Sequence, residues 1–183
     1  MTVPVATSLS VLYAVKEDRL AMVPTAADGT QRVLMVTRRL AGRLVNGFAH
    51  LLERTSAAAA EAPEHARGDM IMFEHQGALV SGHPAARPAR DPAAPTAPGP
   101  STPALATVPA NAALMDAVDV TVKPDRFVLT LKSDAGPVSS MEVTRGDLHR
   151  LLALMRRKCD EAEWNVPIQT RWLDLKSGSM TLN

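Results

Sequence analysis

Four arginines beside two threonines are the residues of this chain whose types and spacing best suit ligand binding. The triplet Val-Thr-Arg occurs at 36–38 and again at 143–145, and a second arginine follows five residues after each triplet's arginine. An arginine at a helix start can meet a phosphate or a carboxylate beside backbone amides that have no partner within the helix. The candidate anion-binding residues are therefore Arg38, Arg43, Arg145 and Arg150.

The alternative interpretation gives these arginines a structural role. They would pair with Asp18 and Asp125 of the preceding turns, or lie in water on the outer face of a helix. Ion pairs on an exposed surface stabilise a fold little. We favour this alternative, because polar residues that recur in a repeat usually belong to turns and surfaces.

Trp164 and Trp172 are the only tryptophans, and both lie in an apolar C-terminal stretch. Tryptophan is a favoured anchor in protein–protein interfaces, so both are candidate partner-binding residues. They would otherwise dock onto the chain's own core. We favour docking onto the chain itself, because a small core needs additional coverage.

The sequence assigns no catalytic residue, no metal site and no cofactor. It has no glycine-rich phosphate loop, no nucleophile elbow and no paired cysteines with zinc spacing. Met70, Met72 and His75 offer soft ligands, but their spacing matches no established metal site. Cys159 falls on a leucine-rich helix face, where a cysteine usually acts as a small buried hydrophobe.

An internal repeat supplies the elements that must position these residues. Residues 11–44 align with residues 118–151 without a gap, and 11 of the 34 positions are identical. Chance would give roughly two or three identities at ordinary residue frequencies. The alternation of apolar residues predicts strands over 9–15, 20–23 and 32–36, the second stopping at Pro24, and then a helix over 38–54 that Thr37 caps.

The second copy predicts the same order. Strands are expected over 118–122, 127–131 and 139–143, followed by a helix that Thr144 caps, with Asp147 completing a capping box. The fold class is therefore α+β, with a duplicated β-β-β-α unit: two antiparallel meanders with one long helix each, packed as a pseudo-two-fold pair.

The predicted domains are 1–80, the first unit with an extension, and 111–183, the second unit with its tryptophan-containing tail. Between them, residues 81–110 contain eight prolines and form a flexible linker rich in proline and alanine. The sequence does not decide the secondary structure of two stretches. Residues 56–66 are an extension of the first helix or a loop, and residues 69–80 contain a strand or a helix.

Composition narrows the function classes. The net charge is +1 and aromatic residues make up 3%, so neither a basic duplex-binding surface nor a stacking platform is indicated. The single cysteine allows no intramolecular disulfide, and no stretch approaches the length of a membrane span. We expect a cytoplasmic protein that contacts no membrane.

The leading hypothesis is a non-catalytic protein–protein interaction or assembly protein whose partner is another protein or a second copy of itself. One alternative is binding of nucleic acid or an anionic ligand through the arginine-bearing helices, of which nucleic acid is the less expected. A second alternative is an enzyme whose site forms between the two units, because catalytic groups far apart in sequence can assemble in space.

Overall fold

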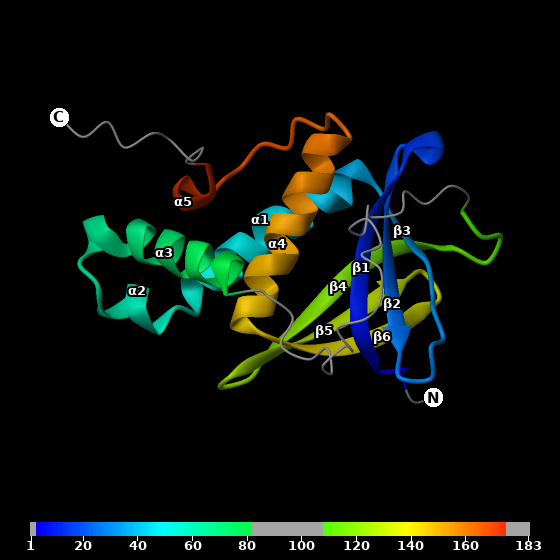
Figure 1. Cartoon of the computed structure of the whole chain (residues 1–183), viewed down its shortest axis with the longest axis horizontal. Helices are drawn as coiled ribbons and strands as arrows, with labels where there is room; N and C mark the ends of the chain where they lie inside the picture. The colour runs from blue at the N-terminus through cyan, green and yellow to red at the C-terminus, as the bar shows by residue number, and fades with distance from the viewer. Residues whose placement is uncertain (1–2, 82–107, 175–183) are drawn as a thin grey trace, which may run out of the picture.

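The computed structural model describes residues 3–81 and 108–174, and it confirms the α+β class (Figure 1). The strands are β1 (Ala6–Ala14), β2 (Arg19–Ala26), β3 (Leu34–Val36), β4 (Ala113–Val122), β5 (Arg126–Ser133) and β6 (Gly136–Thr144). The helices are α1 (Arg38–Arg54), α2 (Ala57–Glu61), α3 (Arg67–Val80), α4 (Arg145–Glu161) and α5 (Arg171–Asp174). Two short 3-10 turns, η1 (Val15–Glu17) and η2 (Glu64–Ala66), complete the described elements.

The strands form one six-stranded mixed sheet in the order β1-β2-β3-β4-β5-β6. Neighbouring strands are antiparallel except for β3 and β4, which pair in parallel through Leu34–Ala113 and Met35–Leu114. The sheet curls so that its two ends meet: a parallel bridge joins Val5 to Ser140, and the Ser140 amide donates to the Pro4 carbonyl at 2.9 Å. The first and the last strand therefore lie side by side at this point.

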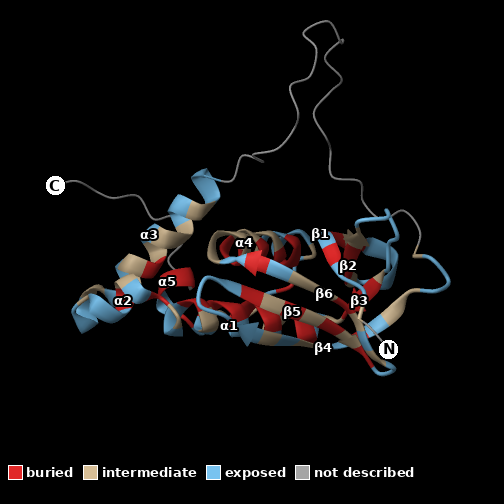
Figure 2. Cartoon of the chain, turned by 90° about the horizontal axis from the view of Figure 1, so that it is seen from below, coloured by how far each residue is buried: buried red, intermediate tan, exposed pale blue. Residues whose placement is uncertain are grey.

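The main core lies between the sheet and the pair α1 and α4 (Figure 2). Apolar side chains from both halves of the chain meet there, including Leu20, Leu34, Leu129 and Leu152, each fully buried. A smaller cluster around Ala21 and Met35 collects the side chains that alternate with the main-core positions along β1, β2 and β3. Helices α2, α3 and α5 gather beyond the sheet around one end of α1 and α4 (Figure 1).

The predicted helix starts are confirmed. Helix α1 has the expected bounds, and the Thr37 hydroxyl accepts from the Leu40 amide at 3.2 Å. At α4, Thr144 and Asp147 form the expected capping box. The end of the second strand was predicted wrongly, because β2 continues through Pro24 to Ala26. The Pro24 carbonyl still accepts from the Arg32 amide at 3.2 Å, so the strand continues although Pro24 has no N–H to donate back on that side.

The two stretches whose secondary structure the sequence left undecided are helical. Residues 57–61 form α2, which Ser56 caps, and 67–80 form α3. Ile71 is fully buried, whereas Phe73 is 57% exposed, so only one face of α3 reaches the core. Most of the predicted linker 81–110 and the end of the predicted tail lie outside the described residues.

Candidate functional site

Helix α1 presents an open basic face. Its apolar residues point into the core, and on the opposite side Arg38, Arg39, Arg43 and Arg54 are exposed together with His50 and Glu53, whose Nδ1 and Oε2 atoms lie 3.7 Å apart. No acidic residue lies in the first turn. Within the described residues, no carboxylate lies within 4 Å of Arg38, Arg39 or Arg43, and these three donate no side-chain hydrogen bond. We define these arginines, with Arg54 and His50, as the α1 basic face.

A groove of about 560 Å³ runs along one side of this face. Its walls are the exposed side of α1 and the extended segment 165–169 that follows α4. Asn46 fixes that segment to α1: its Nδ2 donates to the Pro167 carbonyl at 3.0 Å, and its Oδ1 accepts from the Gln169 amide at 2.8 Å. Gly42 also faces this segment, and a Cβ built there would lie 3.4 Å from Val166 Cγ1.

A second groove, of about 420 Å³, lies on the other side of the same face, between α1 and β4. Leu44 and Leu51 of α1 line its apolar floor together with Val118 and Val120 of β4. Polar side chains form its rim; they are Arg43, His50, Arg54 and Asp116. The α1 basic face is therefore a ridge with a hollow on either side.

The corresponding arginines of α4 have different surroundings. Arg150 donates to Asp147 Oδ1 at 2.5 Å and to the Ala78 carbonyl at 3.1 Å. Arg145 donates through Nε and Nη2 to Glu74 Oε2 at 2.9 and 2.6 Å, and through Nη1 to Thr55 Oγ1 at 2.9 Å. Neither arginine lines the groove beside Arg38 and Arg43, so the four predicted anion-binding residues do not share one site.

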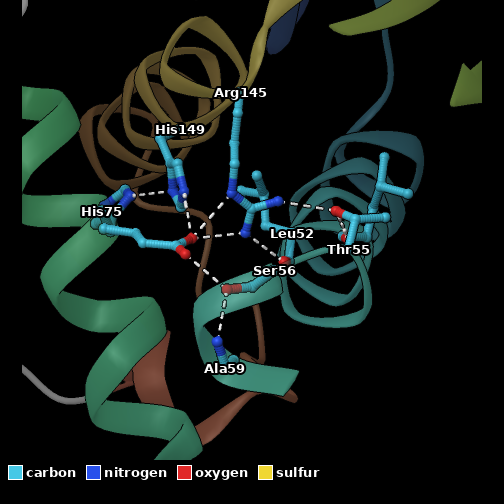
Figure 3. A network of polar contacts seen from close by, with 9 residues as sticks. Leu52, Thr55, Ser56, Ala59, His75, Arg145 and His149 are labelled. Carbon is cyan, nitrogen blue, oxygen red and sulfur yellow. Dashed lines mark hydrogen bonds and ion pairs between the residues drawn. The ribbon is translucent and has the colours of Figure 1, made fainter. Parts of the chain in front are cut away.

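Glu74 is the centre of a polar network that joins α3 to α4 and to the end of α1 (Figure 3). Its Oε1 accepts from the Ser56 hydroxyl at 2.6 Å, and the Ser56 oxygen in turn accepts from the Ala59 amide at 3.0 Å. Arg145 also donates to the Leu52 carbonyl at 2.6 Å. The network therefore holds the last turn of α1, the start of α2, the middle of α3 and the start of α4 in one arrangement.

Two histidines extend this network. His75 and His149 face each other with 3.1 Å between their Nδ1 atoms, and His149 Nε2 lies 3.7 Å from Glu74 Oε2 (Figure 3). Burial, aided by the charge of Arg145 and by that of His75 when it is protonated, lowers the pKa of His149 to about 4. Burial also lowers the pKa of His75, so both rings are neutral near pH 7. One Nδ1 must then donate to the other, which fixes opposite tautomers for the two rings.

This network has the contacts of a structural cluster. The Ser56 hydroxyl donates to Glu74, whose other oxygen pairs with Arg145, and no hydroxyl or thiol in the described part of the chain hydrogen-bonds a histidine. Burial raises the pKa of the Cys159 thiol to about 11, which keeps it protonated and unreactive. No group of three or more metal-ligating side chains among residues 3–81 and 108–174 is arranged to hold an ion.

Both tryptophans are buried within the chain, with 2% of Trp164 and 3% of Trp172 exposed. The Trp164 indole donates to Asp18 Oδ1 at 2.8 Å and packs edge-on against Tyr13. Trp172 packs edge-on against His75 and His149. Docking onto the chain itself is thus what the structure shows, and a partner would reach either indole only after this segment is displaced.

The suggested pairing of the arginines with Asp18 and Asp125 was wrong. Hydrogen bonds from Trp164 and Tyr13 lower the pKa of Asp18, to which Arg38 adds only its charge. Asp125 pairs with Arg126 at 2.8 Å. Sequence reasoning also missed Glu74, Ser56 and Asn46, which are single polar residues in stretches without a recognisable motif.

Comparisons with protein-family models, curated proteins and solved structures gave no match for this chain. No helix in the described ranges is both long enough and apolar enough to cross a membrane.

Proposed function

We propose that this chain is a non-catalytic protein–protein interaction protein that binds an acidic segment of a partner on the α1 basic face. One observation carries the proposal: Arg39 and Arg43 are exposed beside grooves and pair with no carboxylate among the described residues, whereas Arg145 and Arg150 pair with the chain's own oxygens. Arginine forks favour carboxylates and phosphates, so the unpaired arginines select an anionic ligand.

A protein segment fits this face better than a nucleic acid does. Binding of single strands relies on exposed aromatic rings, and the chain has only six aromatic residues besides histidine. Both tryptophans are buried, and Phe48, the only one of the six that lines either groove, is 3% exposed. The floor between α1 and β4 is aliphatic, which suits apolar side chains of a polypeptide.

The duplicated β-β-β-α architecture belongs to this proposal as well. Its support is the order of the elements, with three strands and a long helix in each half, and two parallel contacts between the halves. One is β3 with β4, and the other is the bridge of Val5, just before β1, with Ser140 in the middle of β6. A pseudo-two-fold axis would exchange these two contacts.

Binding of a labelled acidic polypeptide tests the function. The probe is a fluorescein-labelled random copolymer of glutamate and alanine, and the readout is fluorescence anisotropy at low and at moderate salt. We expect the variant Arg38→Ala/Arg39→Ala/Arg43→Ala to bind at least about tenfold more weakly, because it loses several charge-assisted hydrogen bonds. The matched control is Arg32→Ala/Arg67→Ala/Arg157→Ala, which removes the same charge from exposed positions elsewhere.

Equal loss in both triple variants would show attraction to net charge alone and would contradict the proposal. A 20-base-pair DNA duplex serves as the competing probe. If the duplex binds more tightly than the copolymer and loses its affinity in the α1 variant, the anionic partner is a nucleic acid and the protein-segment proposal fails.

A further inference from the structure

Strand β4 has an open edge beside the α1 basic face. On one side it pairs with β5 along most of its length, from Met115 to Val122. On the other side only Ala113 and Leu114 pair with β3, which ends at Val36. Among the described residues, the backbone of 117–122 has no strand partner on that side. Such an edge is a template for one more strand.

The groove between α1 and β4 runs along this open edge. It extends from Leu40 to Arg54 on the helix and from Asp116 to Val120 on the strand. Val118 and Val120 belong to the sheet face that carries the core, since they pair with the buried residues Leu131 and Leu129. A strand added here would therefore direct every second side chain toward α1.

Gly47 leaves space on α1 for one of the side chains that an added strand would direct toward the helix. It is exposed in the middle of the helix, it lines the groove, and a Cβ built on it would meet nothing within 4 Å. Arg43 precedes this gap by one turn, and Arg54 follows it by about two turns. Because Asp116 is the one acid among the described residues that lines the groove, against Arg43 and Arg54, their rim is net positive.

The other sheet edge provides a comparison within the molecule. When the ungapped alignment of the repeat is continued, Leu154 falls at the position of Gly47 and Arg150 at that of Arg43. The groove there, between β1, β6 and α4, is smaller, at about 320 Å³, and both residues line it. Arg150 is already paired with Asp147, so the described residues that line this groove offer neither the gap nor a free cation.

We propose that an extended acidic segment of the partner binds as an added strand on β4, with alternate side chains seated against α1. Its facing positions carry an acid opposite Arg43, an aliphatic side chain over Gly47 and a second acid opposite Arg54. Backbone hydrogen bonds to 117–122 supply the register, and the arginines select the charge. This inference rests on the proposed function and specifies how the same face is used.

A designed heptapeptide tests this arrangement. It carries Glu, Val and Glu at its second, fourth and sixth positions and threonine at the others, with both ends capped. Two matched peptides change one property each: in one, glutamine replaces both glutamates; in the other, alternate backbone nitrogens are methylated, which removes their hydrogen-bond donors. We expect each to bind at least about tenfold more weakly than the parent, in proportion to the hydrogen bonds lost.

The variant Gly47→Leu fills the gap in the way that Leu154 does at the other edge. Replacing an exposed helical glycine should preserve or raise the melting temperature. We expect the heptapeptide to bind this variant at least about tenfold more weakly, because a leucine side chain occupies the space of the central valine. The control is Gly77→Leu in α3, also an exposed helical glycine with open space around its Cβ position, which should leave peptide affinity unchanged.

Hydrogen exchange locates the added strand. The full-length protein should exchange alternate amides of 117–122 rapidly when free and slowly when the peptide is bound. Protection that is already present in the free protein would overturn the proposal, because another segment of this chain or a second copy then covers the edge. Concentration dependence of that protection would identify the second copy.

The outcomes separate this inference from the proposed function. If the copolymer binds through the arginines while the methylated heptapeptide binds as well as its parent, or Gly47→Leu has no effect, strand addition is wrong and the basic face remains a binding surface. If neither the copolymer nor the heptapeptide binds, both proposals fail.

Discussion

Helices α1 and α4 begin with the same Val-Thr-Arg triplet, yet their arginines have different environments. At α4, helix α3 packs alongside, so Arg145 meets Glu74 and Arg150 meets the Ala78 carbonyl. At α1, the neighbouring segment is 165–169, which offers Asn165 and Gln169 to the groove but no carboxylate. The comparison teaches that the residues packed around a motif, and not the motif alone, decide whether an arginine stabilises the fold or remains available to a ligand.

Replacing the first arginine of each helix should give the largest difference in stability between the two motifs. Arg145→Ala leaves the mostly buried Glu74 carboxylate without its cation, so we expect a loss of about 3 kcal/mol in the free energy of unfolding. Arg38→Ala should cost less than about 0.5 kcal/mol, because its side chain makes no such contact. Urea denaturation of both variants measures the difference, and equal losses would contradict the comparison.

Lowering the pH should destabilise the fold through His149 of α4. The pKa of His149 is about 4 in the folded chain and near its ordinary value of 6.5 when unfolded, so the unfolded chain binds the proton more tightly. The stabilisation is therefore complete above pH 6.5 and declines as the pH falls toward 4. Between pH 7 and 4.5 this histidine should account for about 2 kcal/mol of lost stability.

The variant His149→Phe isolates that contribution, since a phenyl ring of similar shape cannot take up the proton. Its free energy of unfolding should decline less between pH 7 and 4.5 than that of the wild type. At the aligned position α1 has Gly42, so no equivalent histidine acts there. Parallel pH profiles for wild type and variant would show that His149 does not titrate as described.

The two helix caps should differ less in their contribution to stability than the two arginines do. Thr144→Ala removes a capping box in which Thr144 and Asp147 exchange hydrogen bonds, and we expect a cost of about 1 kcal/mol. Thr37→Ala removes a single bond to the Leu40 amide and should cost somewhat less. Chemical denaturation measures both, and a larger loss at Thr37 would reverse the expected order.

The smallest expected effect is an increase in stability. Gly47→Ala adds a methyl group in open space on an exposed helix, so we expect about 0.5 kcal/mol of stabilisation from helix propensity. The corresponding change at α4, Leu154→Ala, removes partly buried apolar surface and should destabilise instead. Thermal melts of the two variants should therefore shift in opposite directions.

The parts of this fold that depend on local sequence were predictable. The caps at Thr37 and Thr144 and the leucine periodicity are encoded by neighbouring residues, and the structure has them where the pattern indicated. The 69–80 stretch was ambiguous because a short apolar run such as Met70–Phe73 suits a strand or a helix, and only packing of Ile71 against the core decides.

The candidate site was predictable only in part. The exposed position of Arg43 follows from its place opposite the leucines, and Arg38 and Arg43 do line one groove. Whether Arg145 is paired within the fold depends on Glu74, which is 71 residues away in the sequence. The periodicity of apolar residues cannot predict such a contact. The open edge of β4 likewise depends on β3 being only three residues long, which the repeat did not suggest.

The closure of the sheet has a consequence for how fast the chain folds. The hydrogen bond from Ser139 to the Pro4 carbonyl joins residues 135 positions apart, and the β3–β4 pairing also connects the two halves. Contacts of such large sequence separation form only after a long loop has closed, so they raise the contact order and slow the search for the native state. We therefore expect local structure such as α1 to form early during folding and the sheet to close last.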